Sequence, residues 1–286
     1  MLSKAKSLPC RQAGAGGGRK KIAVITTGGD APGMNAALRA VIRTAVYCGM
    51  SITGVKRGWW GFLEDDYVPL DSRSASGIIA RGGTFLKTRR CPRSKTVPGM
   101  KKISDNLKKI APDGLIVIGG DGSMRAANAV AKNSGVPVIG IPASIDNDIA
   151  GTDETIGFDT AINTALTAID KIRDTATSHE RVFIAEVMGR DSGFLALSSG
   201  IASGAEFILL PEIKTDKKEI LKKIKAFKGE KSSIIIVMAE GAGSSDELAS
   251  YLGKMTKLKV RVSKLGYIQR GGSPSVDSRV LAGVLG

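Results

Sequence analysis

The chain has 286 residues, 42% of them hydrophobic, which is enough to bury the core of one large domain or of two lobes of ordinary size. Its 42 Lys and Arg exceed its 27 Asp and Glu, and the net charge of +15 points to nucleic acid, a membrane surface or a phosphorylated small molecule as partner. No window reaches the roughly 18 consecutive apolar residues of a membrane span, and basic residues spread along the whole chain with only 5% aromatics argue against a nucleic-acid reader.

The first segment, residues 1–20, carries five positive charges and no negative one. It is rich in Gly and Ala and has no apolar core, which predicts a flexible basic leader. The lack of acids also fits an organelle-targeting peptide, which is a minor alternative because the segment has no clear amphipathic helix.

Short apolar runs then alternate with segments of helical spacing. The clearest helix covers residues 33–48, where apolar side chains recur every three or four positions until Gly49. Unbroken apolar runs are typical of strands that are covered on both faces. We expect strands within residues 21–29, 114–122, 136–144, 181–189, 207–212, 233–241 and 260–267. This alternation predicts an α/β fold of two doubly wound lobes with mostly parallel sheets.

Glycines and acids gather where three of these runs end. The first run ends in GGDAPGMN (Gly28–Asn35), the second in GGDGSM (Gly119–Met124) and the third in ASIDND (Ala143–Asp148). In open parallel sheets, ligands bind beyond the carboxyl ends of the strands, and a helix that starts there favours an anion. Each glycine turn alone fits a tight strand-to-helix connection equally well, and neither a Walker A sequence nor G-x-G-x-x-G occurs.

Together the three ends supply the parts of a phosphoryl-transfer site. Backbone N–H groups hold phosphates, one carboxylate holds Mg²⁺, and another takes the proton of the attacking hydroxyl. Arginines at or near apolar runs add positive charge for an anionic substrate, and these are Arg90, Arg181, Arg190, Arg261 and Arg270. Any one of them alone could be a solvated surface charge.

The longer motifs resemble those of the phosphofructokinase family. They are GGDAPGMNAALRAVIR, RGGTFL, IGGDGS, SIDND, GTDETIGFDTA, VMGR and GYIQRGGSP, spread from Lys20 to the last residue. The resemblance implies Rossmann-like lobes, a cytoplasmic location, and transfer of the γ-phosphoryl group of ATP to the 1-hydroxyl of fructose 6-phosphate with Mg²⁺. We expect a larger nucleotide-binding lobe of residues 21–156 plus 268–286, and a smaller sugar-phosphate-binding lobe of residues 157–267.

The resemblance also implies a role for individual residues. Asp146 would be the general base with Asp148 in support, Ser144 would contact the transferring group, and Asp121 would bind Mg²⁺. The nucleotide would be lined by Gly29, Arg90, Cys91, Gly120, Asp121, Gly122 and Ser123. The sugar phosphate would be held by Ser144, Ile145, Asp146, Met188, Gly189, Arg190, Glu240, Tyr267, Ile268, Gln269 and Arg270, with Arg190 also catalytic.

Two further arginines bear on assembly. Arg181 and Arg261 match arginines that reach the substrate 6-phosphate from a neighbouring subunit in the family. The resemblance therefore implies a homo-oligomer, usually a homotetramer, whose ligands are fructose 6-phosphate and ATP rather than nucleic acid or a membrane.

The resemblance also bears on the phosphoryl donor, through two positions. Family members that use pyrophosphate typically have Asp after GGD and Lys before the TIDND segment, where this chain has Gly122 and Ala143. These residues predict ATP, with a pyrophosphate-dependent enzyme as the alternative. The sequence also leaves open a catalytically silent sugar-phosphate-binding subunit and a nucleic-acid binder. The intact residues Asp121, Asp146 and Arg190 argue against the silent subunit.

Three features depart from the family pattern. Tyr267 stands where bacterial ATP-dependent members have His. The bacterial effector site is matched at Arg39, Arg43, Arg173 and Glu206. Ser72 replaces one of its arginines, however, so that Arg39 and Arg43 also fit a merely solvated helix face. Finally, the chain ends before family members usually do, and the part beyond would include helix and strand that close the two lobes.

Overall fold

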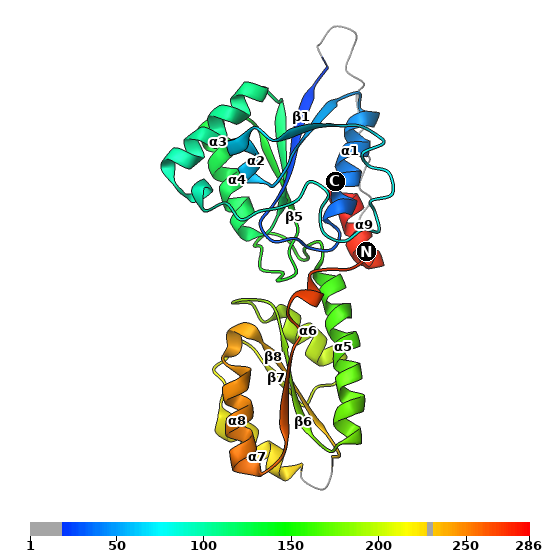
Figure 1. Ribbon diagram of the computed structural model, residues 1–286, viewed down its shortest axis with the longest axis vertical. Coiled ribbons are helices and arrows are strands. Elements are labelled where there is room, and N and C mark those ends of the chain that lie inside the picture. Colours follow the sequence, from blue (N-terminus) through cyan, green and yellow to red (C-terminus); the bar gives the residue numbers. More distant parts are fainter. Residues whose placement is uncertain (1–18, 228–230) are drawn as a thin grey trace.

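The computed structural model describes residues 19–227 and 231–286, and the leader predicted for residues 1–20 falls almost wholly outside this range. The chain forms two lobes stacked along the long axis, each with one sheet covered by helices (Figure 1). The predicted α/β fold of two mostly parallel lobes is thereby confirmed. Within the described ranges, no helix is long and apolar enough to cross a bilayer.

The first lobe contains a sheet in the order β3-β2-β1-β4-β5, in which β3 runs antiparallel to β2 and the other pairs are parallel. Its strands are β1 (Lys21–Thr27), β2 (Ser51–Val55), β3 (Tyr67–Leu70), β4 (Gly114–Gly119) and β5 (Val138–Pro142). One face carries α2 (Trp59–Glu64), α3 (Val97–Ile110) and α4 (Asp121–Ser134), and the other carries α1 (Met34–Tyr47) and α9 (Val276–Leu285) (Figure 1). The strand pleat explains this arrangement, because Ala23 and Ile25 of β1 pack on the α2–α4 side and Val24 packs on the α1 side.

The second lobe contains a parallel sheet in the order β7-β8-β6-β9. Its strands are β6 (Val182–Val187), β7 (Phe207–Leu209), β8 (Ile234–Ala239) and β9 (Val260–Lys264). One face carries α5 (Phe158–Ser178) and α6 (Phe194–Ala202), and the other carries α7 (Lys217–Ala226) and α8 (Ser245–Thr256) (Figure 1). Every residue of β8 is buried, as expected for a strand covered on both faces.

The seven apolar runs all contain a strand, and the helix expected over residues 33–48 is α1. Gly33 precedes α1 with a left-handed φ of 109°, and Gly49, with φ 71°, follows its end. Two strands, β2 and β3, were not expected from the sequence. Neither is an unbroken apolar run: β2 reads SITGV with a Gly, and β3 is a four-residue edge strand with a Pro.

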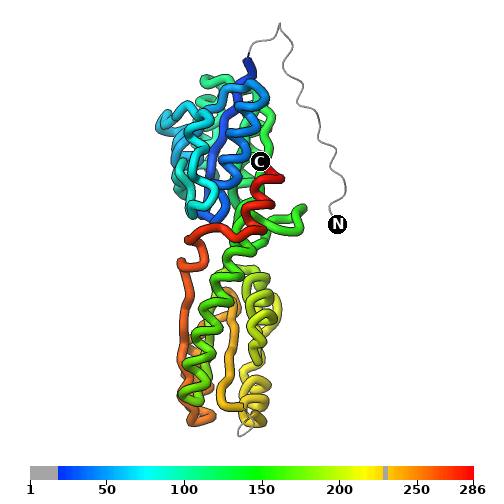
Figure 2. Tube along the Cα trace, turned by 90° about the vertical axis from the view of Figure 1, so that its right-hand side faces the viewer, coloured from blue at the N-terminus to red at the C-terminus, as the bar shows by residue number. Residues whose placement is uncertain are grey.

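The chain passes between the lobes twice (Figure 2). It enters the second lobe at the start of α5, and it returns through a short 3₁₀ helix, η3 (Gly266–Gln269), to reach α9, which packs against α1 and α5. A single cluster of buried side chains includes Val24 of β1, Ile169 of α5 and Val187 of β6. The two lobes therefore share a continuous hydrophobic core.

Candidate active site

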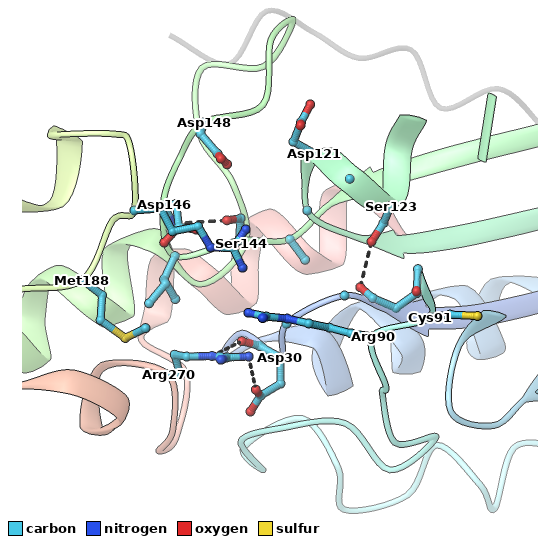
Figure 3. A pocket seen from close by; sticks show the side chains of 18 of the residues that line it. Asp30, Arg90, Cys91, Asp121, Ser123, Ser144, Asp146, Asp148, Met188 and Arg270 are labelled. Carbon is cyan, nitrogen blue, oxygen red and sulfur yellow. Dashed lines mark hydrogen bonds and ion pairs between the residues drawn. The ribbon is translucent and has the colours of Figure 1, made fainter. Parts of the chain in front are cut away.

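A pocket of about 570 Å³ lies between the lobes, where strands of both sheets end at their carboxyl sides (Figure 3). It collects most of the residues singled out in the sequence. Those that line it are Gly29, Arg90, Cys91, Gly120, Asp121, Gly122, Ser123, Ser144, Ile145, Asp146, Asp148, Met188, Arg190, Glu240, Tyr267 and Arg270. In Figure 3, Asp121 and Asp148 lie on one side of the pocket, and Arg90 and Arg270 lie on the other.

The two glycine turns are fastened to each other. Ser123 Oγ donates a hydrogen bond to the carbonyl of Thr27 (3.0 Å), and a Cβ atom on Gly28 would lie 2.8 Å from that same Oγ. Gly28 also has a left-handed φ of 90°, so the turn requires glycine. On the other side, Thr88 Oγ1 donates to the carbonyl of Gly28 (2.9 Å). The loops after β1 and β4 thus form one rigid wall of the pocket.

The N-terminus of α4 faces this pocket without a capping side chain. The helix begins at Asp121 after Gly120, and no side-chain oxygen bonds its first N–H groups. A Cβ atom on Gly122 would meet nothing within 4 Å, so space remains beside the first turn. Unpaired N–H groups and the positive end of the helix dipole are suited to hold phosphate oxygens here.

Asp146 is the most buried acid of the pocket, with 7% of its surface exposed. Its backbone is fixed from both lobes, because its N–H donates to Ser144 Oγ (3.1 Å) and its carbonyl accepts from Ser192 Oγ (3.0 Å). The pKa of Asp146 is raised, mainly because burial disfavours the charged carboxylate. The positive charges of Arg190 and Arg270 oppose the rise, and the negative charges of Asp148 and Glu240 add to it. A carboxylate with a raised pKa is a stronger base than an exposed aspartate.

Arg190 is held in a strained turn beside Asp146. Its φ is 53°, its N–H donates to Glu240 Oε1 (2.9 Å), and its Nε lies 3.6 Å from Asp146 Oδ2. Gly241, in the 3₁₀ helix η2 (Glu240–Ala242), packs so closely on the carbonyl of Arg190 that a Cβ atom there would clash. The ends of β6 and β8 therefore aim the guanidinium at the buried carboxylate.

We expect Arg190→Gln to move the acidic limb of the kcat–pH profile to higher pH. Loss of the positive charge raises the pKa of Asp146 further, and a proton-accepting carboxylate works only above its pKa. The measurement is kcat between pH 5 and pH 9, with Lys218→Gln on the exposed surface of α7 as the charge-matched control. An acidic limb that stays in place or moves to lower pH would show that Arg190 does not favour the ionised form of Asp146.

Several pocket residues were not found from the sequence. Asp30 lies in the GGDAPGMN motif, and its Oδ1 is 2.6 Å from Nη2 of Arg270. Trp59 lines the wall and is 3% exposed, and Lys95 contributes a further cation. An acid in a glycine turn and a basic stretch around Lys95 were visible signals, whereas nothing in the sequence connects Trp59 to the pocket.

Other predicted residues lie outside the pocket lining. Gly189, Ile268 and Gln269 adjoin it in the chain, but Gln269 is fully buried, and its amide nitrogen donates to the carbonyl of Gly266 (3.0 Å). Arg181 precedes β6, and Arg261 of β9 pairs with Phe183 at that same amino end of the sheet. A six-residue strand of about 20 Å separates these two arginines from the pocket.

The residues expected at an effector site fall into two separate groups. Arg173 Nη1 lies 3.9 Å from Glu206 Oε1, and Lys231 Nζ lies 2.8 Å from the same oxygen. Burial alone would raise the pKa of Glu206, but the bonds from Lys231 and from the backbone N–H of Ile235 outweigh it, and the pKa is lowered. Arg39 and Arg43 belong to α1 in the other lobe, so one chain does not bring the two groups together.

The described residues contain no cluster of three or more His, Cys, Asp or Glu suited to a metal ion. Asp121 is the acid in the first turn of α4, and its Oδ2 lies 3.0 Å from Nε of Arg125 one helical turn later. Mg²⁺ in phosphoryl-transfer sites is commonly held by one or two carboxylates together with substrate phosphates and water. An acid in the first turn of a helix whose uncapped start is suited to phosphate oxygens is compatible with that mode.

Comparisons with known proteins agree with one another. The family model described as Phosphofructokinase matches residues 21–286. An ATP-dependent 6-phosphofructokinase from Bacillus velezensis is 54% identical over 269 residues, which cover 93% of this chain and 84% of the relative. The structure of phosphofructokinase from Saccharomyces cerevisiae superposes with a TM-score of 0.86 at 33% identity, covering 93% of this chain and 40% of that one. A pyrophosphate-dependent phosphofructokinase from Marinobacter aquaeolei, with a TM-score of 0.79 at 24% identity over 92% of this chain and 73% of its own, shares the fold.

Proposed function

This chain belongs to the phosphofructokinase family, and we infer that it catalyses the ATP-dependent 6-phosphofructokinase reaction. It transfers the γ-phosphoryl group of ATP to the 1-hydroxyl of D-fructose 6-phosphate, giving fructose 1,6-bisphosphate and ADP, a step of glycolysis. The observation that carries the proposal is the buried Asp146 between a phosphate-binding wall and a group of arginines. We also propose that the protein is located in the cytoplasm.

The chemistry divides between the two walls of the pocket. The N-terminus of α4 and the turn at Gly28 and Gly29 hold the phosphates of ATP, and Arg90 extends into the pocket beside them (Figure 3). Asp146 takes the proton of the sugar 1-hydroxyl. At the same time, the hydroxyl oxygen forms a bond to the γ-phosphorus, and the bond from that phosphorus to the ADP oxygen breaks. Arg190 lies beside Asp146, where it offsets negative charge on the transferring group.

The proposal assigns Mg²⁺ to Asp121, together with phosphate oxygens and water. When bound, the ion would neutralise part of the negative charge of the phosphate groups. To bind the metal, the Asp121 carboxylate would have to leave its ion pair with Arg125. This ion pair is exposed to solvent and therefore weak. Asp121 is already at the helix start to which the phosphates are assigned here.

A coupled assay of the purified chain with fructose 6-phosphate tests the activity. ADP formation with ATP, and much slower turnover with pyrophosphate, is the expected result. Faster turnover with pyrophosphate would make the chain a pyrophosphate-dependent enzyme. Sugar-phosphate binding without turnover by either donor would make it a catalytically silent subunit.

The assembly is part of the proposal, because Arg181 and Arg261 cannot reach the pocket of their own chain. Both side chains lie at the amino end of the second sheet, where they are accessible to a second copy. We propose that they bind the 6-phosphate in the pocket of a neighbouring subunit of a homotetramer.

Mixing two impaired variants at a low concentration of fructose 6-phosphate tests this exchange of arginines. Arg261→Ser alone should raise KM for fructose 6-phosphate about tenfold or more, since a charge-assisted contact to phosphate is lost. Subunits with Arg261→Ser and subunits with Asp146→Asn should regain activity when they are exchanged into one oligomer, because some pockets then combine the intact base with the intact arginine. Each variant mixed with itself is the control. Hybrid oligomers that show no gain would contradict the assignment.

A further inference from the structure

Arg270 is surrounded on three sides before any ligand binds. Its Nη2 lies 2.6 Å from Asp30 Oδ1, its Nε donates to the carbonyl of Asp30 (3.3 Å), and its guanidinium lies 5.6 Å from the ring centre of Tyr267. The backbone of Gly29 closes the third side, where a Cβ atom would lie 2.7 Å from Nη2. The arginine side chain is 17% exposed, so its position is defined by these contacts.

The contacts of Asp30 are with Arg270 and not with the start of the helix that follows it. It is not the N-cap of α1, because Gly33 occupies that position and no side chain bonds the first turn. Its carboxylate is 38% exposed at the pocket, and the partner it holds comes from a segment 240 residues further along the chain. Asp30 therefore connects the β1–α1 loop of the first lobe to the segment that returns from the second.

We propose that Asp30 is a positioning residue that sets the guanidinium of Arg270 for the sugar-phosphate substrate. Nε and Nη2 of Arg270 both donate hydrogen bonds to Asp30, to its backbone carbonyl and its carboxylate. Within the described chain, Nη1 of Arg270 donates no hydrogen bond. A guanidinium held by two of its donors keeps the remaining ones directed, so less freedom is lost when a substrate oxygen binds. The inference rests on the proposed function, in which Arg270 contacts fructose 6-phosphate.

Because Arg270 also lies near Asp146, the role of Asp30 should be visible in the pH dependence of kcat as well. The groups that face Asp146 are Arg190, Asp148, Glu240 and Arg270, and Arg270 is one of the two that favour its ionised form. Asp30 neutralises Arg270 from the far side. With Asn in place of Asp30, the amide oxygen still accepts from Arg270 but the balancing charge is gone. The acidic limb of kcat should then move to lower pH.

The experiment measures steady-state rates for single and double variants. Asp30→Ala should raise KM for fructose 6-phosphate about 10- to 100-fold, as expected for a lost charge-assisted bond, while KM for ATP stays near the parent value. Asp30→Glu, which keeps the charge, should restore part of the affinity. In the Arg270→Ala background, Asp30→Ala should cause little further change, because the two residues act as one unit.

A matched control separates positioning from stability. Asp66→Ala breaks a comparable pair in the same lobe, between Asp66 Oδ2 and Arg57 Nη2 at 2.8 Å, away from the pocket lining, and should leave both KM values unchanged. An active parent whose KM for fructose 6-phosphate does not rise with Asp30→Ala, or falls because Asp30 competes with the substrate for Arg270, overturns the proposal. Additive effects in the double variant overturn it too. A parent that does not phosphorylate fructose 6-phosphate at all overturns the proposed function instead.

Discussion

Asp146→Asn is expected to lower kcat by about 10²- to 10⁴-fold or more, because the amide cannot take the proton of the 1-hydroxyl. The fold should tolerate the change, since the hydrogen bonds of Asp146 to Ser144 and Ser192 use its backbone N–H and carbonyl. Binding of fructose 6-phosphate should stay near the parent value. Rates come from a coupled assay, and binding from calorimetry without a phosphoryl donor.

The adjacent acid provides the control for this experiment. Asp148 also lines the pocket but is exposed, so Asp148→Asn should have a smaller effect on kcat. Near-normal turnover of Asp146→Asn would show that another group accepts the proton. A loss of sugar-phosphate binding equal to the loss of rate would instead make Asp146 a binding residue.

Gly122→Asp is expected to suppress the use of ATP by about 10²-fold or more in kcat/KM. Two like charges about 4 Å apart repel by about 4 kcal/mol at an effective dielectric constant of 20, and part of this is relieved when the nucleotide shifts. The protein itself should accept the residue, because a Cβ atom at position 122 meets nothing within 4 Å and an acid in the first turn of α4 suits the helix dipole.

Gly122→Ala separates the effect of charge from that of volume. It fills part of the same space without a charge and should keep most of the ATP activity. Pyrophosphate use need not appear in Gly122→Asp, because Ala143 is 1% exposed in the core and supplies no cation. ATP rates equal to those of the parent would contradict the placement of the nucleotide beside α4.

The sequence predicted those parts of the molecule that depend on local pattern. Continuous apolar runs located β1 and β8, and the glycine and acid motifs located the loops at the carboxyl ends of β1, β4 and β5. The strand β2 was missed because its burial alternates and its sequence contains a glycine and polar residues. A short segment in which polar residues and a glycine interrupt the apolar residues gives no clear signal for a buried strand.

Contacts between distant segments could not be predicted in the same way. The pair of Asp30 and Arg270 spans 240 residues, and the bond from Ser123 to Thr27 spans 96. Both depend on how the strand ends meet in space. The raised pKa of Asp146 likewise follows from its burial at the junction of the lobes, which a one-dimensional pattern cannot show.

The hydrophobic core that runs from β1 through α5 to β6 means that the lobes are not interchangeable modules. A fragment cut at the start of α5 would expose the apolar side chains of α1 that α9 covers, and it would lack the arginine that returns from the second lobe. We therefore expect the stability of the two sheets to be coupled, so that both are lost together on unfolding. Tight binding of a nucleotide to the first lobe would then slow amide hydrogen exchange in the second, although the ligand touches few of its residues.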